Sequence, residues 1–473
     1  MLFSGLDFIF RFLPVFLIVY RLVPARARKG VLFVGSLVFY ALGEPVYVLL
    51  LLAELVIGYA LYRISSHTRK KWITGLAIVL EVAVLAFFKF GAFLSGEVLR
   101  LGGGAGWIFP EGMADALAKG QEIALPLGIS FYTFQLIAFL SDEGMREPSP
   151  GERPVSFGSF AAYITMFPQL VAGPIVQYRE VREDMEAPAM TLRGLEEGGK
   201  IFAAGLAYKV LLANPVGTLF RSVLTAGVRG LGAENAWLGA IAYTFQIYFD
   251  FYGYSLMAIG LGKMLGFSLP ENFREPYSAR SFTQFWRRWH ITLGRWFREY
   301  VYIPLGGSRA GKARTIRNLL IVWALTGIWH GAGWNFLLWG LLFFVLLVLE
   351  KNVYGRFLEK HAVAGHLYVL LLLPVTWVIF GISDPGTLAG YLRSMVGLTQ
   401  GSVLTGSEVF MRHLHTYGAL LAACLVCATP LPAQLWERYR KKVWMSLLLF
   451  AAFLFACYEL AIGSSNPFLY FRF

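Results

Sequence analysis

Long apolar runs separated by short polar turns follow one another along almost the whole chain. Several approach the ~20 residues that an α-helix needs to cross a bilayer. Alternating segments of about ten residues, which are typical of a transmembrane barrel, do not stand out. The pattern predicts an all-α polytopic membrane protein with about eleven transmembrane helices. The runs expected to form them are Phe8–Val23, Val31–Ile64 (a hairpin broken at Gly43-Glu44-Pro45), Trp72–Leu94, Ile123–Leu140, Ile201–Leu224, Ala236–Phe267, Leu319–Trp329, Trp334–Leu349, Leu367–Ile382, Tyr417–Leu431 and Val443–Ile462.

One apolar stretch is too interrupted to form a plain span. Phe157–Val176 contains Pro168 and the pair Gly173-Pro174, and proline breaks the hydrogen-bond ladder of a helix. Irregular backbone is tolerated at membrane depth only where it is buried in protein or lines a cavity. We therefore expect a re-entrant element here.

A second interruption places a histidine at the end of an apolar helix. Asn318–Trp329 would extend about 18 Å at 1.5 Å per residue, well short of the ~30 Å hydrocarbon core. His330 follows at once, and Gly331-Ala332-Gly333 then loosens the backbone. The spacing predicts a broken or re-entrant helix that carries His330 deep into the membrane.

Composition and charge agree with a multi-pass membrane protein. Of the 473 residues 57% are hydrophobic and only 15% are charged, against about 25% charged in an average soluble domain. The net charge of +13 fits the positive-inside bias of cytoplasmic loops. The basic loops Arg26–Lys29 and Arg63–Lys71 fall on one side, which puts the N-terminus outside. The basic residues are scattered among the spans, so we expect no nucleic-acid partner.

Metal chemistry is not expected. Cys424 and Cys427 form a C-x-x-C pattern, but it lies inside an apolar run. In that setting small residues are better explained by helix packing than by redox or metal work.

The segment Ser281–Asn318 combines arginine with aromatic residues. Such a mixture is the signature of an interfacial amphipathic helix that contacts lipid headgroups. It equally suits a rim that binds phosphate groups, and both interpretations remain open. Its basic residues are Arg287, Arg288, Arg295, Arg298, Arg309, Lys312, Arg314 and Arg317.

Two histidines are the candidate catalytic residues. Ionisable residues inside a membrane usually face a cavity or a proton relay, which favours a function for His330. A neutral core histidine bonded to a carbonyl is the simpler alternative. His290 suits an acid–base group or a structural anchor equally well. Either a transferase or a transporter fits His330, although a transporter should show paired broken segments in two halves, and we find no such symmetry.

Several ordered motifs resemble the membrane-bound O-acyltransferase (MBOAT) family, and most closely its alginate O-acetylation branch. The resemblance covers most of the chain. Tyr252 and Leu256 stand where that branch usually has serine and aspartate. The motifs are Leu125–Gln135, Phe167–Ile175, Gln246–Phe251, Pro270–Phe273, Phe285–His290, Tyr302–Gly307 and Trp329–Gly331.

The resemblance implies a fold and a place in the cell. It implies one MBOAT membrane domain over residues 1–473, with re-entrant and interfacial helices around a central tunnel. We expect N-terminal helices over about residues 1–122, a catalytic core over 123–350 and C-terminal helices over 351–473. The expected location is the bacterial inner membrane.

The resemblance also implies roles for particular residues. His330 is the expected catalytic histidine and His290 its companion. The implied donor is acetyl-CoA, whose phosphates would meet Arg287, Arg288, Arg295 and Arg298. Trp329 or Asn335 would polarise the thioester carbonyl. Asp250, which lies in an apolar run, would either orient a histidine or simply bond backbone.

Partners and alternatives follow from the same branch. Periplasmic acetyltransferases or other polysaccharide-modification proteins would receive the acetyl group, with membrane lipids around the protein. The acceptor would be an exported polysaccharide such as alginate. Teichoic-acid D-alanylation, peptidoglycan O-acetylation and a non-enzymatic proton-coupled transporter remain the alternatives.

Overall fold

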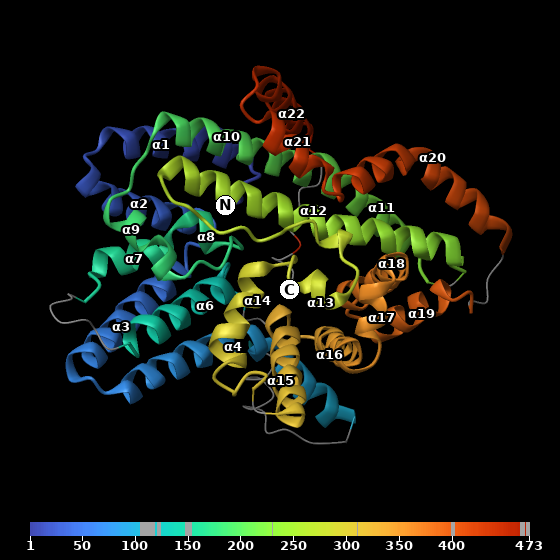
Figure 1. The fold of residues 1–473 in the computed structure, drawn as a ribbon, viewed down its shortest axis with the longest axis horizontal. Coiled ribbons are helices and arrows are strands. Elements are labelled where there is room, and N and C mark those ends of the chain that lie inside the picture. The colour runs from blue at the N-terminus through green and yellow to red at the C-terminus, as the bar shows by residue number, and fades with distance from the viewer. Residues whose placement is uncertain are drawn as a thin grey trace. The chain divides into compact units, whose positions relative to one another are not determined.

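The computed structural model describes residues 1–104, 119–120, 124–146, 154–228, 230–309, 311–398, 403–463 and 469. Within these ranges the regular structure is helical, and the one β-bridge joins Phe273 to Trp289. The prediction of an all-α chain is confirmed. Figure 1 shows the helices coloured along the chain.

The chain packs as two compact units. Unit 1 comprises residues 1–2, 7–195 and 262–269, and unit 2 comprises residues 3–6, 196–261 and 270–473. The expectation of one membrane domain stays a prediction. The helices of unit 1 are η1 (Phe8–Phe12), α1 (Leu13–Leu22), α2 (Ala25–Ala41), α3 (Val48–Thr68), α4 (Lys71–Gly104), α6 (Ile129–Phe139), η2 (Leu140–Gly144), α7 (Phe157–Thr165), α8 (Phe167–Leu170) and α9 (Tyr178–Glu186).

Unit 2 holds the remaining helices, of which α10 begins and α12 ends in unit 1. They are α10 (Leu192–Ala207), η3 (Tyr208–Ala213), α11 (Asn214–Thr225), α12 (Ala233–Leu265), η4 (Pro276–Ser278), α13 (Phe282–Trp286), α14 (Ile291–Phe297), η5 (Arg298–Tyr302), α15 (Lys312–His330), α16 (Trp334–Leu349), η6 (Glu350–Tyr354), α17 (Gly355–Lys360), α18 (Ala362–Gly381), α19 (Pro385–Met395), α20 (Val403–Cys427), α21 (Leu431–Tyr439) and α22 (Val443–Ala461).

Seven helical stretches in the described part of the chain are long and apolar enough to cross a membrane. The expected number was about eleven, and some of the difference comes from short helices. The helix α6, for example, has 11 residues, or about 17 Å at 1.5 Å per residue. The seven are Val48–Thr68, Lys71–Gly102, Leu192–Thr225, Trp334–Lys360, Ala362–Gly381, Ser407–Cys427 and Val443–Ala461.

The predicted breaks in unit 1 are present. The helices α2 and α3 form the hairpin expected around Gly43. The stretch Phe157–Val176 divides into α7, the one-turn α8 and extended backbone, and nearly all of it is buried. The interruption is therefore confirmed, while its re-entrant path stays a prediction.

The predicted break after His330 is also present, but the helix before it is longer than expected. The helix α15 begins at Lys312 and not near Asn318. Its 19 residues span about 28 Å, close to the ~30 Å of hydrocarbon. The estimate of a short helix was wrong, because the basic residues of the first turns were assigned to a loop. His330 is nevertheless the last residue of α15, and α16 starts at Trp334.

The two helices that flank this break pack backbone against backbone. A Cβ atom built on Gly340 of α16 would lie 2.4 Å from the carbonyl oxygen of Trp323. A Cβ on Gly327 of α15 would lie 2.5 Å from that of Phe336. Small residues allow such close helix packing within membranes. The antiparallel pair α15–α16 is therefore held in one register by two glycines.

The segment Ser281–Asn318 does not form one continuous helix, and its contact with lipid headgroups or with phosphate stays a prediction. It contains the short α13 and α14 and then η5 before α15 begins. Its aromatic residues Phe282, Phe285, Trp289, Trp296 and Phe297 are buried. These rings pack against other residues of unit 2. The ring centroids of Trp289 and Trp377, for example, lie 5.1 Å apart.

A substitution at Gly340 tests this packing. Gly340→Ala should lower the free energy of unfolding by about 1–3 kcal/mol, because the methyl group pushes α15 and α16 apart. Gly75→Ala is the matched control, since a Cβ on Gly75 meets nothing within 4 Å and alanine favours the helix by about 1 kcal/mol. Thermal unfolding in detergent measures both. Equal midpoints for the two variants would contradict the close packing.

Candidate active site

His330 lies in an aromatic enclosure at the end of α15. Its ring centroid is 4.9 Å from that of Trp329, 5.0 Å from Trp339 and 5.2 Å from Phe380. These rings come from α15, α16 and α18, so the enclosure requires all three helices. The residue is 5% exposed. The sequence prediction of a buried imidazole at a helix end is confirmed.

Trp329 connects the two candidate histidines. Its ring centroid lies 6.0 Å from that of His290 and 4.9 Å from that of His330. The centroids of the two imidazole rings are therefore no farther apart than the sum of these two distances. The fold thus brings together two histidines that are forty residues apart in the sequence.

The backbone of His290 is in a strained conformation. Its φ of 44° and ψ of 53° are left-handed, and it precedes the first turn of α14. A non-glycine residue in this region costs roughly 1–2 kcal/mol, and such residues cluster at functional sites. A short antiparallel pairing holds it there: Ile291 donates its N–H to the carbonyl of Asn272, and Arg274 donates to that of Arg288.

The side chain of Asn272 fixes the tautomer of His290. The Oδ1 atom of Asn272 accepts hydrogen bonds from the backbone N–H and the hydroxyl of Thr292, at 3.3 and 2.9 Å. Its Nδ2 atom donates to Ser255 Oγ at 3.0 Å. Because Oδ1 is an acceptor, the His290 Nδ1 atom 3.1 Å away must carry the proton. Nε2 of His290 then keeps its lone pair.

His290 is neutral in the folded protein. Burial lowers the pKa of His290 from 6.5 to about 3. Its Nε2 atom is buried and has no hydrogen-bond partner among the described residues. Between about pH 3 and 6.5 the unfolded chain binds a proton that the folded chain excludes, so His290 makes stability fall as pH drops through that window. A neutral imidazole with an open lone pair can accept a hydrogen bond, whereas a pKa of about 3 makes it a weak proton acceptor at neutral pH.

Asn335 holds the enclosure together. Its Nδ2 atom donates to the carbonyl oxygen of Phe380 at 2.8 Å and so ties the start of α16 to the end of α18. Phe380 in turn packs on His330. The bond indicates a positioning role for Asn335. The polarisation of a carbonyl by Asn335 or Trp329 stays a prediction.

The four arginines proposed to bind the donor differ in exposure and in their contacts. Arg287 and Arg298 are exposed, and Arg295 is half-buried on α14. Arg288 turns toward η4, where its guanidinium donates to Ser278 Oγ at 2.7 Å. Their part in donor binding remains a prediction.

Of the two expected roles of Asp250, the structure shows the bond to backbone and places none of the described histidines on its carboxylate. One carboxylate oxygen pairs with Lys209 of η3, and the other accepts the backbone N–H of Leu469 at 2.9 Å. Both side chains are almost completely buried. Asp250 therefore neutralises a buried ammonium group and holds the C-terminal tail at Leu469. Nothing in the local sequence marks Lys209 as its partner.

Sequence reasoning also missed several residues of the site. Asn272 lies in the motif Pro270–Phe273, but the motif by itself predicts no role for it. Trp339 and Phe380 lie in apolar runs that look like ordinary spans. Glu350 accepts hydrogen bonds from the N–H groups of Phe282 and Thr283 at 2.6 and 2.8 Å, which anchors α13. The motif Pro270–Phe273, beside that of His290, was the one available signal.

Comparison with known proteins supplies a family. Residues 145–383 match the membrane-bound O-acyltransferase family. The chain is 31% identical to a probable alginate O-acetylase of Pseudomonas putida over all of both chains. It is 37% identical to a probable alginate O-acetylase of Azotobacter vinelandii over 80% of this chain and 75% of that protein. It is also 33% identical to a peptidoglycan O-acetyltransferase of Helicobacter pylori, over 84% and 80% of the two chains.

A charge placed at position 272 tests the tautomer assignment. Asn272→Asp sets a carboxylate beside Nδ1 of His290, which stabilises the imidazolium and should raise the pKa of His290 by at least one unit above about 3. NMR titration of histidine-labelled protein measures it, with His290→Gln to assign the signal. Asn352→Asp adds the same charge at an exposed site and should leave the titration unchanged. An unshifted His290 in Asn272→Asp would refute the network.

The buried pair of Lys209 and Asp250 predicts a non-additive effect on stability. Asp250→Asn should destabilise the fold by about 3–5 kcal/mol, because it removes the carboxylate that neutralises a buried ammonium. Adding Lys209→Met should recover much of the loss, since no buried charge then remains. Thermal unfolding in detergent of both variants measures this. A double variant no more stable than Asp250→Asn would contradict the pairing.

Proposed function

The chain belongs to the membrane-bound O-acyltransferase family, and we propose that it moves an acetyl group from acetyl-CoA at the cytoplasmic face for the O-acetylation of an exported polysaccharide such as alginate. The position of His330 carries this proposal, since it lies buried at the end of a helix with a second imidazole nearby. The full-length similarity to a probable alginate O-acetylase supports the acceptor class.

The proposed chemistry needs a base and good alignment. A thioester is already activated, so holding donor and acceptor in place accounts for much of the rate. His330 takes the proton of an acceptor hydroxyl while that oxygen attacks the thioester carbon. The new C–O bond forms, the C–S bond breaks, and the departing thiolate receives the proton from His330. In the alternative route, a ring nitrogen of His330 first attacks the thioester carbon and the C–S bond breaks. The acceptor oxygen then displaces that nitrogen, so the C–N bond breaks as the C–O bond forms, and the hydroxyl proton passes to the thiolate.

Access to His330 is part of the proposal. With His330 only 5% exposed, a donor and an acceptor must enter through an opening between the surrounding rings. The tunnel of the family, about eleven transmembrane helices and an N-terminus outside the bacterial inner membrane are the arrangement that we propose. In it the basic start of α15 lies at the cytoplasmic side, because positive residues favour that side.

The acetyl group must then leave the membrane protein. We propose that a periplasmic acetyltransferase or a related polysaccharide-modification protein receives it. Peptidoglycan is the second candidate acceptor, because the chain is 33% identical to a peptidoglycan O-acetyltransferase over most of its length. Mass analysis of the labelled polymer separates the two acceptors.

Replacement of His330 tests the function. His330→Ala should abolish transfer of labelled acetyl groups to polymer, a loss of at least about 100-fold for removal of an acid–base group. His415→Ala removes an exposed histidine of α20 and should transfer normally. Both variants must reach the membrane at wild-type levels. Full acetylation by membranes that carry His330→Ala would overturn the assignment.

A further inference from the structure

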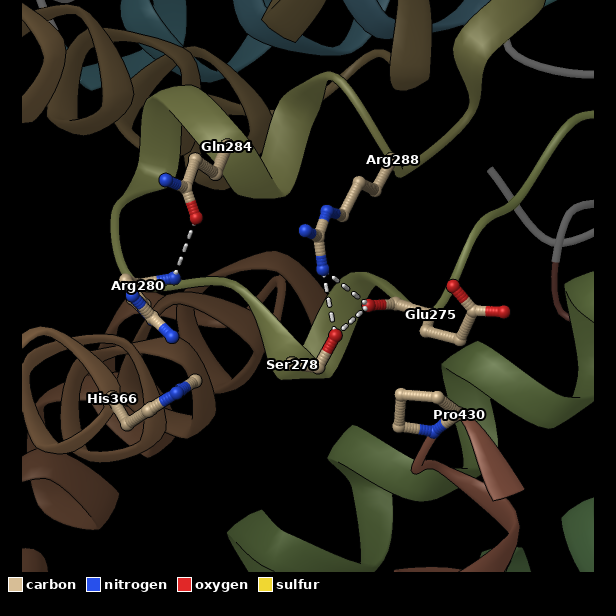
Figure 2. A pocket seen from close by; sticks show the side chains of 7 residues that line it. All are labelled: Glu275, Ser278, Arg280, Gln284, Arg288, His366 and Pro430. Atoms are coloured by element: carbon tan, nitrogen blue, oxygen red, sulfur yellow. Dashed lines mark hydrogen bonds between the residues drawn. The ribbon is translucent and has the colours of Figure 1, made fainter. Parts of the chain in front are cut away.

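A basic pocket of about 500 Å³ lies in unit 2 at the start of α18. Its volume is within the range of ~300–1,000 Å³ typical of small-molecule sites. Figure 2 shows the side chains that line it. They are Glu275, Ser278, Arg280, Gln284, Arg288, His366 and Pro430.

Three basic side chains meet at this pocket from separate elements. Arg280 lies just before α13, Arg288 follows α13, and His366 is on α18. Figure 2 places Arg280 beside His366 and Arg288 opposite them. A single carboxylate, that of Glu275, is among the lining groups. The lining therefore has a positive balance and favours an anion.

The arginines have donors to spare. The Nη1 atom of Arg288 is bonded to Ser278 Oγ and to the carbonyl oxygen of Glu275. Its Nε and Nη2 atoms, and the whole guanidinium of Arg280, take part in none of the hydrogen bonds or ion pairs of the described residues. An arginine held on one edge and open on the other presents the planar fork that binds phosphate oxygens.

The helix α18 connects this pocket to the catalytic histidine. Its first turn packs on Arg280, because a Cβ built on Gly365 would lie 2.6 Å from the carbonyl oxygen of Arg280. Its last turn holds Phe380, which contacts His330. Gly365 and Phe380 are fifteen residues apart, a rise of about 22 Å along the helix.

The arm of a coenzyme A thioester is shorter than this rise. About fourteen bonds separate its phosphate from the acyl carbon, the equivalent of nearly five amino-acid residues, and such a chain spans roughly 16 Å when extended. Donor binding in the pocket therefore requires the side chains at its two ends to cover the remaining ~6 Å.

We propose that this pocket binds the phosphate groups of the acyl donor through Arg280, Arg288 and His366, at the opposite end of α18 from His330. The inference rests on the proposed function and adds Arg280 and His366 to the residues that bind the donor. An anionic lipid headgroup offers the same phosphate chemistry, so the experiment must separate the two sources.

Two donors that share the thioester arm, one with and one without the phosphate-bearing nucleotide, test the proposal on the full-length protein in vesicles. Arg280→Gln and His366→Gln should each raise KM for acetyl-CoA about tenfold, the loss typical of one charge-assisted hydrogen bond, with kcat unchanged. With acetyl-pantetheine, which lacks the phosphates, kcat/KM should not change. Arg356→Gln removes an exposed arginine of α17 as the matched control. An unchanged KM for acetyl-CoA in both variants would overturn donor binding here.

Direct binding separates this inference from the proposed function. His330→Ala should still bind coenzyme A with wild-type affinity, whereas Arg280→Gln should bind it about tenfold more weakly. If wild-type protein binds no coenzyme A, the donor assignment fails. Retention of phosphatidylglycerol, followed by native mass spectrometry and lost in Arg280→Gln, would then assign the pocket to a lipid headgroup. If Arg280→Gln weakened the binding of neither coenzyme A nor phosphatidylglycerol, that result would refute a phosphate site altogether.

Discussion

The close contact between α15 and α16 is the constraint on which the candidate site depends. Within a membrane, apolar side chains gain little by leaving lipid for protein, so helices associate through tight packing and polar contacts. Gly327 and Gly340 let the two backbones approach until a single methyl group would not fit. That approach sets the register in which Trp339 faces His330. A different register would put another residue of α16 against the imidazole.

Several buried polar groups inside unit 2 are matched to partners. Asp250 neutralises Lys209, Glu350 anchors the start of α13, and Asn272 satisfies Thr292 and His290 together. Unmatched buried polar atoms cost free energy and are uncommon in native proteins. The Nε2 atom of His290 is one of the buried atoms without a hydrogen-bond partner among the described residues, together with the indole nitrogens of Trp339 and Trp377. It lies on a side chain that packs beside Trp329, which also touches His330, and its part in the reaction stays a prediction.

In the arginine-rich segment Ser281–Asn318, packing separates the aromatic residues from the arginines. Most of its aromatic residues are buried in unit 2, while five of its seven arginines are exposed. Arg288 instead joins Arg280 and His366 at a pocket. The composition suited lipid anchoring and phosphate binding equally. Because α13 and α14 are short, the backbone changes direction every few residues. Neighbouring side chains in this segment can therefore point to different surroundings and have different roles.

The amino-acid sequence by itself determined the helical class, the hairpin at Gly43, the break after His330 and the family, because all four are local or ordered patterns along the chain. Apolar length, proline and glycine act within a few residues and can be recognised there. Only the tertiary structure decided the partner of Asp250, the tautomer of His290 and the meeting of Arg280 with His366. These depend on side chains that are 18 to more than 80 positions apart. No local propensity encodes which of many apolar helices will bring such residues into contact.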